Sequence, residues 1–406
     1  MNEPKLRFRA DDGSQFPDWE EKKLNEIAAR VTRKNKDNVT DIPLTISSAD
    51  GLIDQRDFFN KVVASKDMSG YYLLKNGEFA YNKSYSKGYD FGSIKRLDLY
   101  DEGALSTLYI CFALNKNEKS DFYQKYFDSL SWYPELQKIC AEGARNHGLL
   151  NVPTNDFFQL KLCVPSSEQE QQKIAEFLST IDTVIEKQKE TVSAWEERKK
   201  GVMQKLFSQE VRFKADDGSE FPEWEEKKLG EMGDIMTGNT PSTKQEDYYG
   251  GCYLWVTPAD ITDSREVSVT AKKLTELGYT VARHIPANSV LVTCIASIGK
   301  NAIIRENGSC NQQINSITPY NDYSVEFVYY LICQNERLLH ANAGTGGMEI
   351  LNKDSFSKIK MYFPCLEEQQ KIADCLSSLD EVIEKQKATL AAWEELKKGL
   401  LQQMFV

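Results

Sequence analysis

The strongest constraint on the fold is that the chain contains two of its segments twice. The segment Arg7–Leu24 returns as Arg212–Leu229, at an offset of 205 residues. The longer segment Glu170–Phe207 returns as Glu368–Phe405, at an offset of 198 residues and with 25 identities over 38 positions. Matches of this length do not arise by chance. The chain is therefore built from two copies of one unit, and the fold must accommodate that repeat.

The stretches between the repeated segments do not resemble each other. The order along the chain is therefore a short hook, a variable domain and a long helix, followed by the same three parts again. The predicted boundaries are residues 1–21 and 211–226 for the hooks, 22–164 and 227–363 for the variable domains, and 165–210 and 364–406 for the helices. Shared parts of such a repeat bind something shared, whereas divergent parts recognise different things.

Each repeated helix carries seam residues at alternating intervals of four and three, a heptad pattern that predicts a coiled coil. The first helix contributes Ile174, Leu178, Ile181, Ile185, Gln188, Val192, Trp195, Lys199, Val202 and Leu206, and the second contributes Ile372, Leu376, Leu379, Ile383, Gln386, Leu390, Trp393, Lys397, Leu400 and Met404. Gln188 and Gln386 interrupt the pattern at matching positions, where a polar residue either fixes the register of pairing or lies at a solvated edge. We expect the two helices to pack antiparallel on each other, although the pattern leaves pairing with a second chain open.

The variable domains alternate short apolar runs with turns, which predicts mixed α/β domains. Runs typical of strands include Tyr71–Leu74 and Ala104–Phe112 in the first domain and Ser289–Ile295 in the second, and helical segments are expected at Phe122–Cys140 and Val325–Ala341. The predicted fold class is therefore α+β: two mixed α/β domains joined by two long antiparallel coiled-coil helices, with a pseudo-two-fold repeat.

The net charge of the chain is −11, which by itself argues against a DNA-binding protein. The negative charge, however, lies outside the variable domains. Lys22–Cys163 sums to +2 and Lys227–Phe363 to −1, whereas the hooks and helices together sum to −12. The variable domains can therefore present local basic surfaces to DNA phosphates.

Polar loops between the expected strands supply side chains that can neutralise phosphates or pair with base edges in the major groove. In the first domain the candidate DNA-binding residues are Arg33, Lys34, Asn35, Lys36, Asn82, Lys83, Ser84, Tyr85, Lys87, Lys95, Arg96, Arg145 and Asn146. In the second domain they are Asn239, Thr240, Lys244, Ser297, Lys300, Asn301, Asn311, Gln312 and Gln313. Any one loop alone is better explained as a solvated turn, and it is their concentration on two linked domains that favours DNA binding.

Signatures of catalysis are missing from the sequence. It contains no G-x-x-x-x-G-K-[S/T] phosphate-binding loop and no Asn-Pro-Pro-aromatic tetrapeptide of the kind that amino-methyltransferases use. Its three histidines, His147, His284 and His340, form no pair at metal-ligand spacing. We therefore expect no catalytic residue, no metal and no cofactor in this chain, which disfavours a stand-alone methyltransferase–nuclease.

The sequence also carries no signal for a membrane. No apolar run approaches the roughly 18 residues that a membrane span needs, and Met1–Asp12 lacks the apolar region of a secretory signal. The nine cysteines are scattered without a C-x-x-C pair, which is typical of buried reduced thiols. The expected location is therefore the cytoplasm, with no membrane partner.

Three motifs carry a family resemblance. Phe-Pro-[Asp/Glu]-Trp-Glu-Glu-Lys-Lys-Leu opens each half, Glu-Gln-Gln-Lys-Ile-Ala follows each variable domain, and Trp-Glu-Glu-x-Lys-Lys-Gly lies near the end of each long helix. Across its whole length the chain resembles the specificity subunits of type I restriction–modification systems. The loops Thr237–Ser242 and Ala296–Gly299 are similar to loops common in the target-recognition domains of that family.

This resemblance implies a DNA-specificity subunit that is not itself an enzyme. Each variable domain would be a target-recognition domain for one half of a bipartite double-stranded DNA target. The helices would set the spacing and dock two methyltransferase (modification) subunits, which restriction subunits then join. S-adenosylmethionine would belong to the methyltransferase, and ATP and magnesium to the restriction subunit. A structural coiled-coil adaptor without DNA contact is the alternative. The resemblance does not identify the base-reading residues, because the recognition domains of the family diverge.

Overall fold

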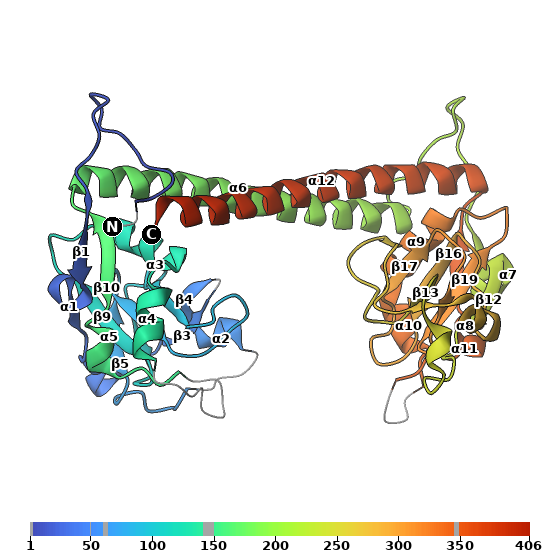
Figure 1. The fold of residues 1–406 in the computed structure, drawn as a ribbon. Helices are drawn as coiled ribbons and strands as arrows, with labels where there is room; N and C mark the ends of the chain where they lie inside the picture. Colours follow the sequence, from blue (N-terminus) through green and yellow to red (C-terminus); the bar gives the residue numbers. More distant parts are fainter. Residues whose placement is uncertain (1–2, 49, 60–63, 141–149, 345–348) are drawn as a thin grey trace. The chain divides into compact units, whose positions relative to one another are not determined.

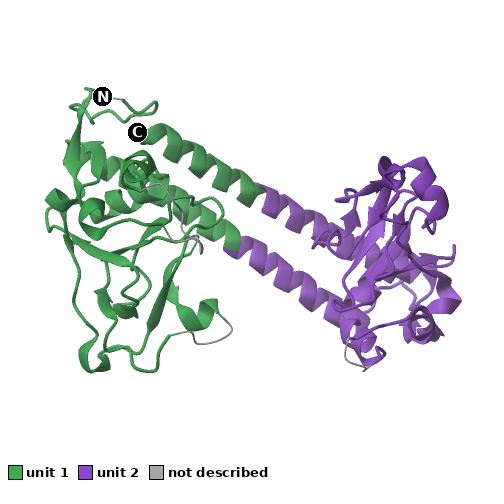
Figure 2. Ribbon diagram, turned by 60° about the horizontal axis from the view of Figure 1, so that its bottom comes forward, with its two compact units in different colours: residues 1–189, 389–406 green, residues 190–388 purple. Residues whose placement is uncertain are grey.

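The computed structural model describes residues 3–48, 50–59, 64–140, 150–344 and 349–406. The chain forms two compact units (Figure 2): residues 1–189 with 389–406 make up unit 1, and residues 190–388 make up unit 2. Each unit contains one hook, one variable domain and about half of each long helix. The units divide the helices near their middle because each helix half packs on a variable domain.

The variable domain of unit 1 is built on two four-stranded sheets, with strand orders β2-β9-β6-β7 and β4-β3-β8-β5 (Figure 1). Its strands are β2 (Ala28–Arg30), β3 (Pro43–Ser47), β4 (Gly51–Asp54), β5 (Tyr72–Lys75), β6 (Phe79–Asn82), β7 (Ser93–Arg96), β8 (Glu102–Leu105) and β9 (Ile110–Leu114), and its short helices are α1 (Leu24–Ile27), η1 (Lys36–Asn38), α2 (Gln55–Phe58), α3 (Ser120–Ser129), α4 (Tyr133–Ile139) and α5 (Thr154–Phe157). A separate antiparallel pair, β1 (Trp19–Lys23) with β10 (Lys161–Pro165), ties the end of the hook to the end of the domain.

The variable domain of unit 2 has a five-stranded sheet, β12-β19-β16-β17-β14, and a three-stranded sheet, β15-β13-β18. Its strands are β12 (Gly233–Thr237), β13 (Tyr249–Val256), β14 (Glu266–Val267), β15 (Lys273–Leu274), β16 (Ser289–Thr293), β17 (Asn301–Ile304), β18 (Ser309–Cys310) and β19 (Ile314–Pro319), and its short helices are α7 (Leu229–Met232), η2 (Glu246–Tyr248), α8 (Glu276–Val281), α9 (Val325–Gln334), α10 (Glu336–Ala341) and α11 (Lys353–Lys358). The pair β11 (Glu225–Lys228) with β20 (Lys360–Phe363) repeats the role of β1 and β10. The two domains thus differ in sheet topology although their supports match.

The two long helices are α6 (Glu168–Phe207) and α12 (Leu366–Met404). In unit 1, Leu178 and Leu401 belong to one apolar cluster, and Asp182 lies 2.6 Å from Lys397. In the direction in which residue numbers increase along α6, they decrease along α12, so the two helices are antiparallel in unit 1. In unit 2 the ion pairs Glu196–Lys387 and Lys199–Asp380, at 2.8 and 2.5 Å, show the same antiparallel direction. The antiparallel arrangement predicted from the heptads is confirmed.

The structure buries half of the twenty predicted seam residues and leaves the other half partly exposed. Ile174, Leu178, Ile181, Ile185, Ile372, Leu376 and Ile383 are buried, and Leu379, Gln188 and Gln386 are half-buried. Trp195 and Trp393 are also only half-buried. A seam that is closed by aliphatic residues and more open at the glutamines and tryptophans follows from the larger and more polar side chains at those positions.

A helix of each variable domain attaches that domain to the long helices. In unit 1 the buried Lys125 of α3 places its Nζ 2.5 Å from Asp182 of α6. In unit 2 the hydroxyl of Tyr330 on α9 donates to Asp380 of α12 at 2.5 Å. The two aspartates occupy equivalent positions in the repeat, so the same carboxylate receives a different donor from each variable domain.

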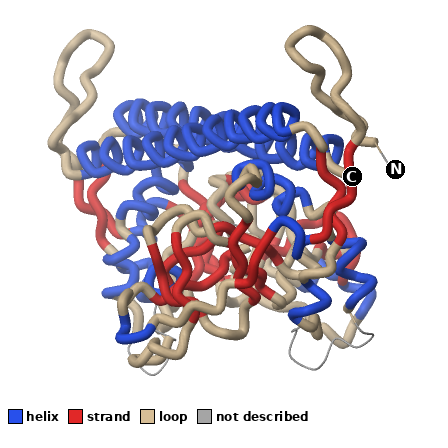
Figure 3. Tube along the Cα trace, turned by 90° about the vertical axis from the view of Figure 1, so that its left-hand side faces the viewer, coloured by secondary structure: helices blue, strands red, loops and turns tan. Residues whose placement is uncertain are grey.

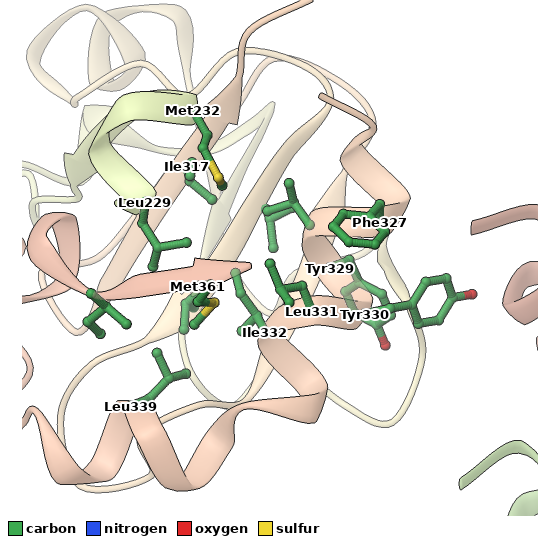
Figure 4. Packing of buried hydrophobic residues seen from close by; sticks show 14 of the residues in the cluster. Leu229, Met232, Ile317, Phe327, Tyr329, Tyr330, Leu331, Ile332, Leu339 and Met361 are labelled. Atoms are coloured by element: carbon green, nitrogen blue, oxygen red, sulfur yellow. The ribbon is translucent and has the colours of Figure 1, made fainter. Parts of the chain in front are cut away.

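Each unit has one main apolar core that includes side chains of both long helices. The core of unit 1 is aromatic, with Tyr81 stacked on Phe157 at 4.9 Å and Phe79 on Phe112 at 5.4 Å. In unit 2, α9 inserts Phe327, Leu331 and Ile332 toward side chains from α7 and β20 (Figure 4). Burial of such side chains stabilises the folded unit by about 1.5–3 kcal/mol each.

Three predicted segments turn out to be interrupted. The apolar run Ala104–Phe112 contains two strands of different sheets, because Ser106–Tyr109 form a turn. The expected helix Phe122–Cys140 is split into α3 and α4 at Leu130, whose φ of 63° is left-handed and ends the helix. The expected helix Val325–Ala341 is split into α9 and α10 at Asn335. Hydrophobic periodicity continues across all three breaks, which is why the pattern alone joined them.

Candidate nucleic-acid interface

In unit 1, the loop after β6 keeps its central residues at the surface. Tyr85 is 60% exposed and Lys87 is exposed. Asn82 accepts the backbone N–H of Ser84 at 3.0 Å and so shapes the turn, while Lys83 donates to the carbonyl of Val152 at 3.2 Å. Burial lowers the pKa of Lys83. The hydrogen bonds of the first loop residues therefore fix the conformation of the loop, and Tyr85 and Lys87 are left exposed at its centre.

The neighbouring cations Lys95 and Arg96 hold α3 against β7. Lys95 lies 2.7 Å from Asp128 and 5.7 Å from the ring centre of Tyr89. Although burial opposes it, the negative charge of Asp128 raises the pKa of Lys95. Arg96 makes ion pairs with Asp98 and Asp121 at 2.6 and 2.7 Å. Both cations thus have acidic partners in the folded domain, and their contact with DNA stays a prediction.

The Arg33–Lys36 loop is also partly structural. Arg33 lies 2.7 Å from Glu78, and Lys34 lies 4.2 Å from the ring centre of Tyr72. Asn35 is fully buried, with its side chain hydrogen-bonded to both backbone groups of Thr40. Asn35 is therefore a loop-closing residue and the prediction that it contacts DNA is wrong, whereas Lys36 remains exposed. Arg145 and Asn146 lie outside the described residues.

In unit 2, the Thr237–Lys244 loop is fixed by its asparagine. The side chain of Asn239 donates to the carbonyl of Val281 at 3.2 Å and accepts the N–H of Arg283 at 2.6 Å. The next residue, Thr240, donates to the side-chain oxygen of Gln312 at 2.5 Å. Thr240, Lys244 and Gln312 are exposed, whereas Asn239 is half-buried. This arrangement brings two of the predicted loops into one continuous surface.

Two further asparagines of unit 2 support loops from inside. Asn301 is 8% exposed and donates to the carbonyl of Gly299 at 3.1 Å, and Asn311 is 7% exposed and donates to Gln313 at 3.0 Å. Both are corrected from base-contacting to loop-supporting residues. Lys300 is exposed, and Ser297 and Gln313 are half-buried.

Sequence reasoning missed an aromatic stack beside Asn239. Tyr279 lies between Tyr253 and His284, with ring centres 4.3 and 4.1 Å apart and planes within 7° of parallel. His284 and the adjacent Arg283 are exposed, and Arg283 donates to the carbonyl of Thr237 at 2.7 Å. The only sequence signal was the Arg-His pair itself. The stack gives this loop surface a rigid, basic edge.

The second half of the chain is similar to a known protein family. Residues 222–392 match the model of the type I restriction modification DNA specificity domain. The MjaIX specificity subunit of Methanocaldococcus jannaschii is 32% identical over 211 residues, covering 49% of this chain and 48% of that protein. The HindI specificity subunit of Haemophilus influenzae is 33% identical over 150 residues, covering 36% of this chain and 32% of that protein. The chain thus matches half or less of the length of these two relatives.

A longer alignment and two solved structures cover more of the chain. The MjaVIII specificity subunit of Methanocaldococcus jannaschii is 25% identical over 77% of this chain and 76% of that protein. The chain is thus similar to type I restriction enzyme specificity subunits, and residues 222–392 match their DNA specificity domain. A chain from a study of complex assembly and conformational transition of the type I R-M system aligns with a TM-score of 0.56 and 18% identity, over 96% of this chain and 98% of that one. The S subunit of M. genitalium aligns with a TM-score of 0.54 and 14% identity, over 100% and 99%.

The similarity to specificity subunits fits the architecture. At 14–18% identity the solved chains establish a common fold, and that fold includes the first half of the chain, which lies outside the matched domain model. The internal repeat links the two halves independently, since the hook and helix of the matched second half recur in the first. Among the described residues, no helix is long and apolar enough to span a membrane.

Proposed function

We propose that this specificity subunit recognises double-stranded DNA at a bipartite target, with each variable domain acting on one half-site. The observation that carries the proposal is the division of the repeat: two domains of different sheet topology stand on hooks and helices of nearly the same sequence. Similar supports with divergent domains are the arrangement expected of a protein that recognises two different half-sites. The exposed loop residues Tyr85, Lys87, Thr240, Lys300 and Gln312 are suited to phosphate and base contacts.

The chain is proposed to act as a non-catalytic component of a larger complex in the cytoplasm. Two modification subunits would dock on its repeated parts, and restriction subunits would join them. S-adenosylmethionine would be bound by the modification subunits, and ATP and magnesium by the restriction subunits. The helix pair would set the spacing of the half-sites, because α6 and α12 each continue without a break from residues of one unit to residues of the other.

Methylome sequencing of cells that express the chain with a modification subunit tests this proposal directly. The expected result is one methylated motif composed of two short half-sites separated by a gap of fixed length. Cells that lack the chain but contain the modification subunit are the control. A methylated motif that is the same with and without the chain would contradict the proposal, and so would assembly without any DNA binding, which is the behaviour of a structural adaptor.

A further inference from the structure

Asp182 on α6 and Asp380 on α12 occupy equivalent positions of the repeat, and each accepts a donor from the variable domain of its own unit. In unit 1 the donor is the ammonium of Lys125 on α3, which is 6% exposed and lies 2.5 Å from Asp182. In unit 2 the donor is the hydroxyl of Tyr330 on α9, which lies 2.5 Å from Asp380. Two domains with different sheets therefore bring donors of different chemistry to the same position of the repeated helix.

Each aspartate also accepts a lysine from the other long helix. Lys397 lies 2.6 Å from Asp182, and Lys199 lies 2.5 Å from Asp380. Each carboxylate is therefore a junction at which both long helices and one variable domain meet within a unit.

In unit 1, α3 connects this junction to the hairpin of strands β6 and β7. The sheets of unit 1 lie on one side of the long helices (Figure 3), and α3 lies against those helices (Figure 1). Asp128 of α3 lies 2.7 Å from Lys95 of β7. Strand β7 pairs with β6, and the loop between them carries the exposed Tyr85 and Lys87. Asp182 therefore fixes, through α3, where this loop lies relative to the long helices of unit 1.

In unit 2, α9 connects the junction to the hairpin of strands β16 and β17 in the same way. The thiol of Cys333 on α9 donates to the side-chain oxygen of Asn301 on β17 at 3.4 Å, and α9 shares an apolar core with side chains of both strands. The loop between β16 and β17 carries the exposed Lys300. Asp380 therefore fixes this loop through α9.

Arg265 makes a second connection between the same hairpin and α12. Its carbonyl accepts the N–H of Ile303 on β17 at 2.8 Å. Its guanidinium donates to the hydroxyl of Tyr330 at 3.2 Å and to that of Ser377 on α12 at 2.7 Å. The hydroxyl of Tyr330 is thus both a donor to the junction and an acceptor from the residue that holds β17, so its loss alters both connections.

We propose that Asp182 and Asp380 are positioning residues for DNA reading, each of which sets the orientation of one hairpin loop through the donor that it accepts from the variable domain. The inference rests on the proposed function, because it assigns part of each half-site to a hairpin loop. Base contacts require side chains held within about 0.5 Å of their productive geometry. Attraction to phosphates depends on charge and extends over about 10 Å at 0.1 M salt. A tilted hairpin therefore loses discrimination between bases before it loses general affinity for DNA.

Two substitutions that each remove one donor test this proposal. Tyr330→Phe removes the hydroxyl and keeps the buried ring, and Lys125→Met removes the ammonium. Each chain is assembled with modification subunits, and fluorescence anisotropy gives the Kd for a duplex that contains the methylated motif and for duplexes with one base changed in either half-site. Tyr330→Phe should lower the affinity ratio of correct to changed duplex about threefold to tenfold for the half-site of unit 2 only. Lys125→Met should do the same for the half-site of unit 1 only. Exchange of one variable domain identifies which half-site belongs to which unit.

Matched controls separate positioning from stability. Tyr320→Phe removes an exposed hydroxyl that donates to Asp234 at 3.0 Å, and Lys138→Met removes an exposed cation of α4, and neither should change either ratio. A purely structural role would reduce the folded fraction and hence the binding of all duplexes alike, which leaves the ratios unchanged. Tyr330→Phe decides the question if Lys125→Met does not fold.

Unchanged ratios in Tyr330→Phe, or an equal change in both half-sites, would overturn the inference. Absence of any sequence preference in the wild-type complex would instead overturn the proposed function on which the inference rests.

Discussion

Asp182 on α6 and Lys397 on α12 lie 2.6 Å apart, and the same pair recurs with the helices exchanged as Asp380 and Lys199 at 2.5 Å. The offset of 198 residues relates both members of one pair to both members of the other. An antiparallel pair of repeated helices produces this result, because the aspartate of each helix then lies beside the lysine of the other helix. The two pairs set the register of the helices within each unit.

The first prediction concerns these aspartates. Asp182→Asn with Asp380→Asn should lower the free energy of unfolding by about 1–3 kcal/mol per site. The buried Lys125 would lose its counter-ion at Asp182, and Tyr330 and Lys199 would lose a charged acceptor at Asp380. Chemical denaturation checks this. The exposed Glu197→Gln is the control and should change stability little. Equal stability of the double variant and the wild type would mean that these pairs do not secure the domains.

The second prediction is a pH dependence at Asp182. Burial raises the pKa of this carboxyl, but hydrogen bonds and charges from Lys125 and Lys397 outweigh burial, so its pKa lies below the ordinary value of 3.8. A group with a depressed folded pKa stabilises the protein above its unfolded pKa and loses that contribution as the pH falls through the folded pKa. The stability difference between wild type and Asp182→Asn should therefore be constant above pH about 5 and shrink below pH about 3.8. Thermal unfolding at pH 3 to 7 measures it, and a difference that grows on acidification would contradict this assignment.

The third prediction concerns the basic edge missed by sequence reasoning. Arg283→Ala and His284→Ala should each weaken DNA binding about tenfold if they contact the target, and Arg283→Ala should reduce the salt dependence by about one ion. Fluorescence anisotropy of the assembled complex at several salt concentrations measures both. Lys358→Ala removes an exposed cation elsewhere in unit 2 and serves as the control. Equal effects of all three substitutions would indicate a general charge effect and not a contact surface.

The fourth prediction is modular specificity. Exchange of Lys22–Cys163 for the corresponding domain of another specificity subunit should change one half of the methylated motif and leave the other half as it was. The reason is that the variable domain of unit 2 has its own sheets and its own core. Methylome sequencing gives the answer, and changes in both halves would show that the domains do not act separately.

The fifth prediction concerns the helices. Insertion of four residues after Gln188 shifts the heptads of α6 out of phase. We expect the gap between half-sites to change, or binding to be lost, while the bases of each half-site stay the same. A seven-residue insertion at the same point preserves the phase but also lengthens α6, so it separates the effect of helix phase from that of helix length. An unchanged gap with altered half-site bases in the four-residue variant would show that the helices do not set the spacing.

The sequence by itself determined the repeat and the two long helices, whereas their antiparallel pairing within one chain was an expectation that the structure confirmed. Residues at alternating intervals of four and three mark one face of a helix whatever the rest of the chain does, and the repeat places Asp182 and Asp380 at equivalent positions on the two helices. These are local or symmetric properties, which a linear pattern carries in full. The family resemblance rests on the same repeated segments.

The tertiary structure alone decided which polar residues are free to bind. Asn35, Asn301 and Asn311 look in the sequence like surface asparagines, yet they are buried because they satisfy backbone groups of their own loops. Lys95 pairs with Asp128, 33 residues away, and Arg96 pairs with Asp121, 25 residues away, both on α3, and a linear pattern does not show such pairings. The stack of Tyr253, Tyr279 and His284 likewise exists only because strand β13 and helix α8 fold side by side. The sequence gives the charge of a side chain. Whether that side chain is free to bind a ligand depends on neighbouring residues that only the fold brings close.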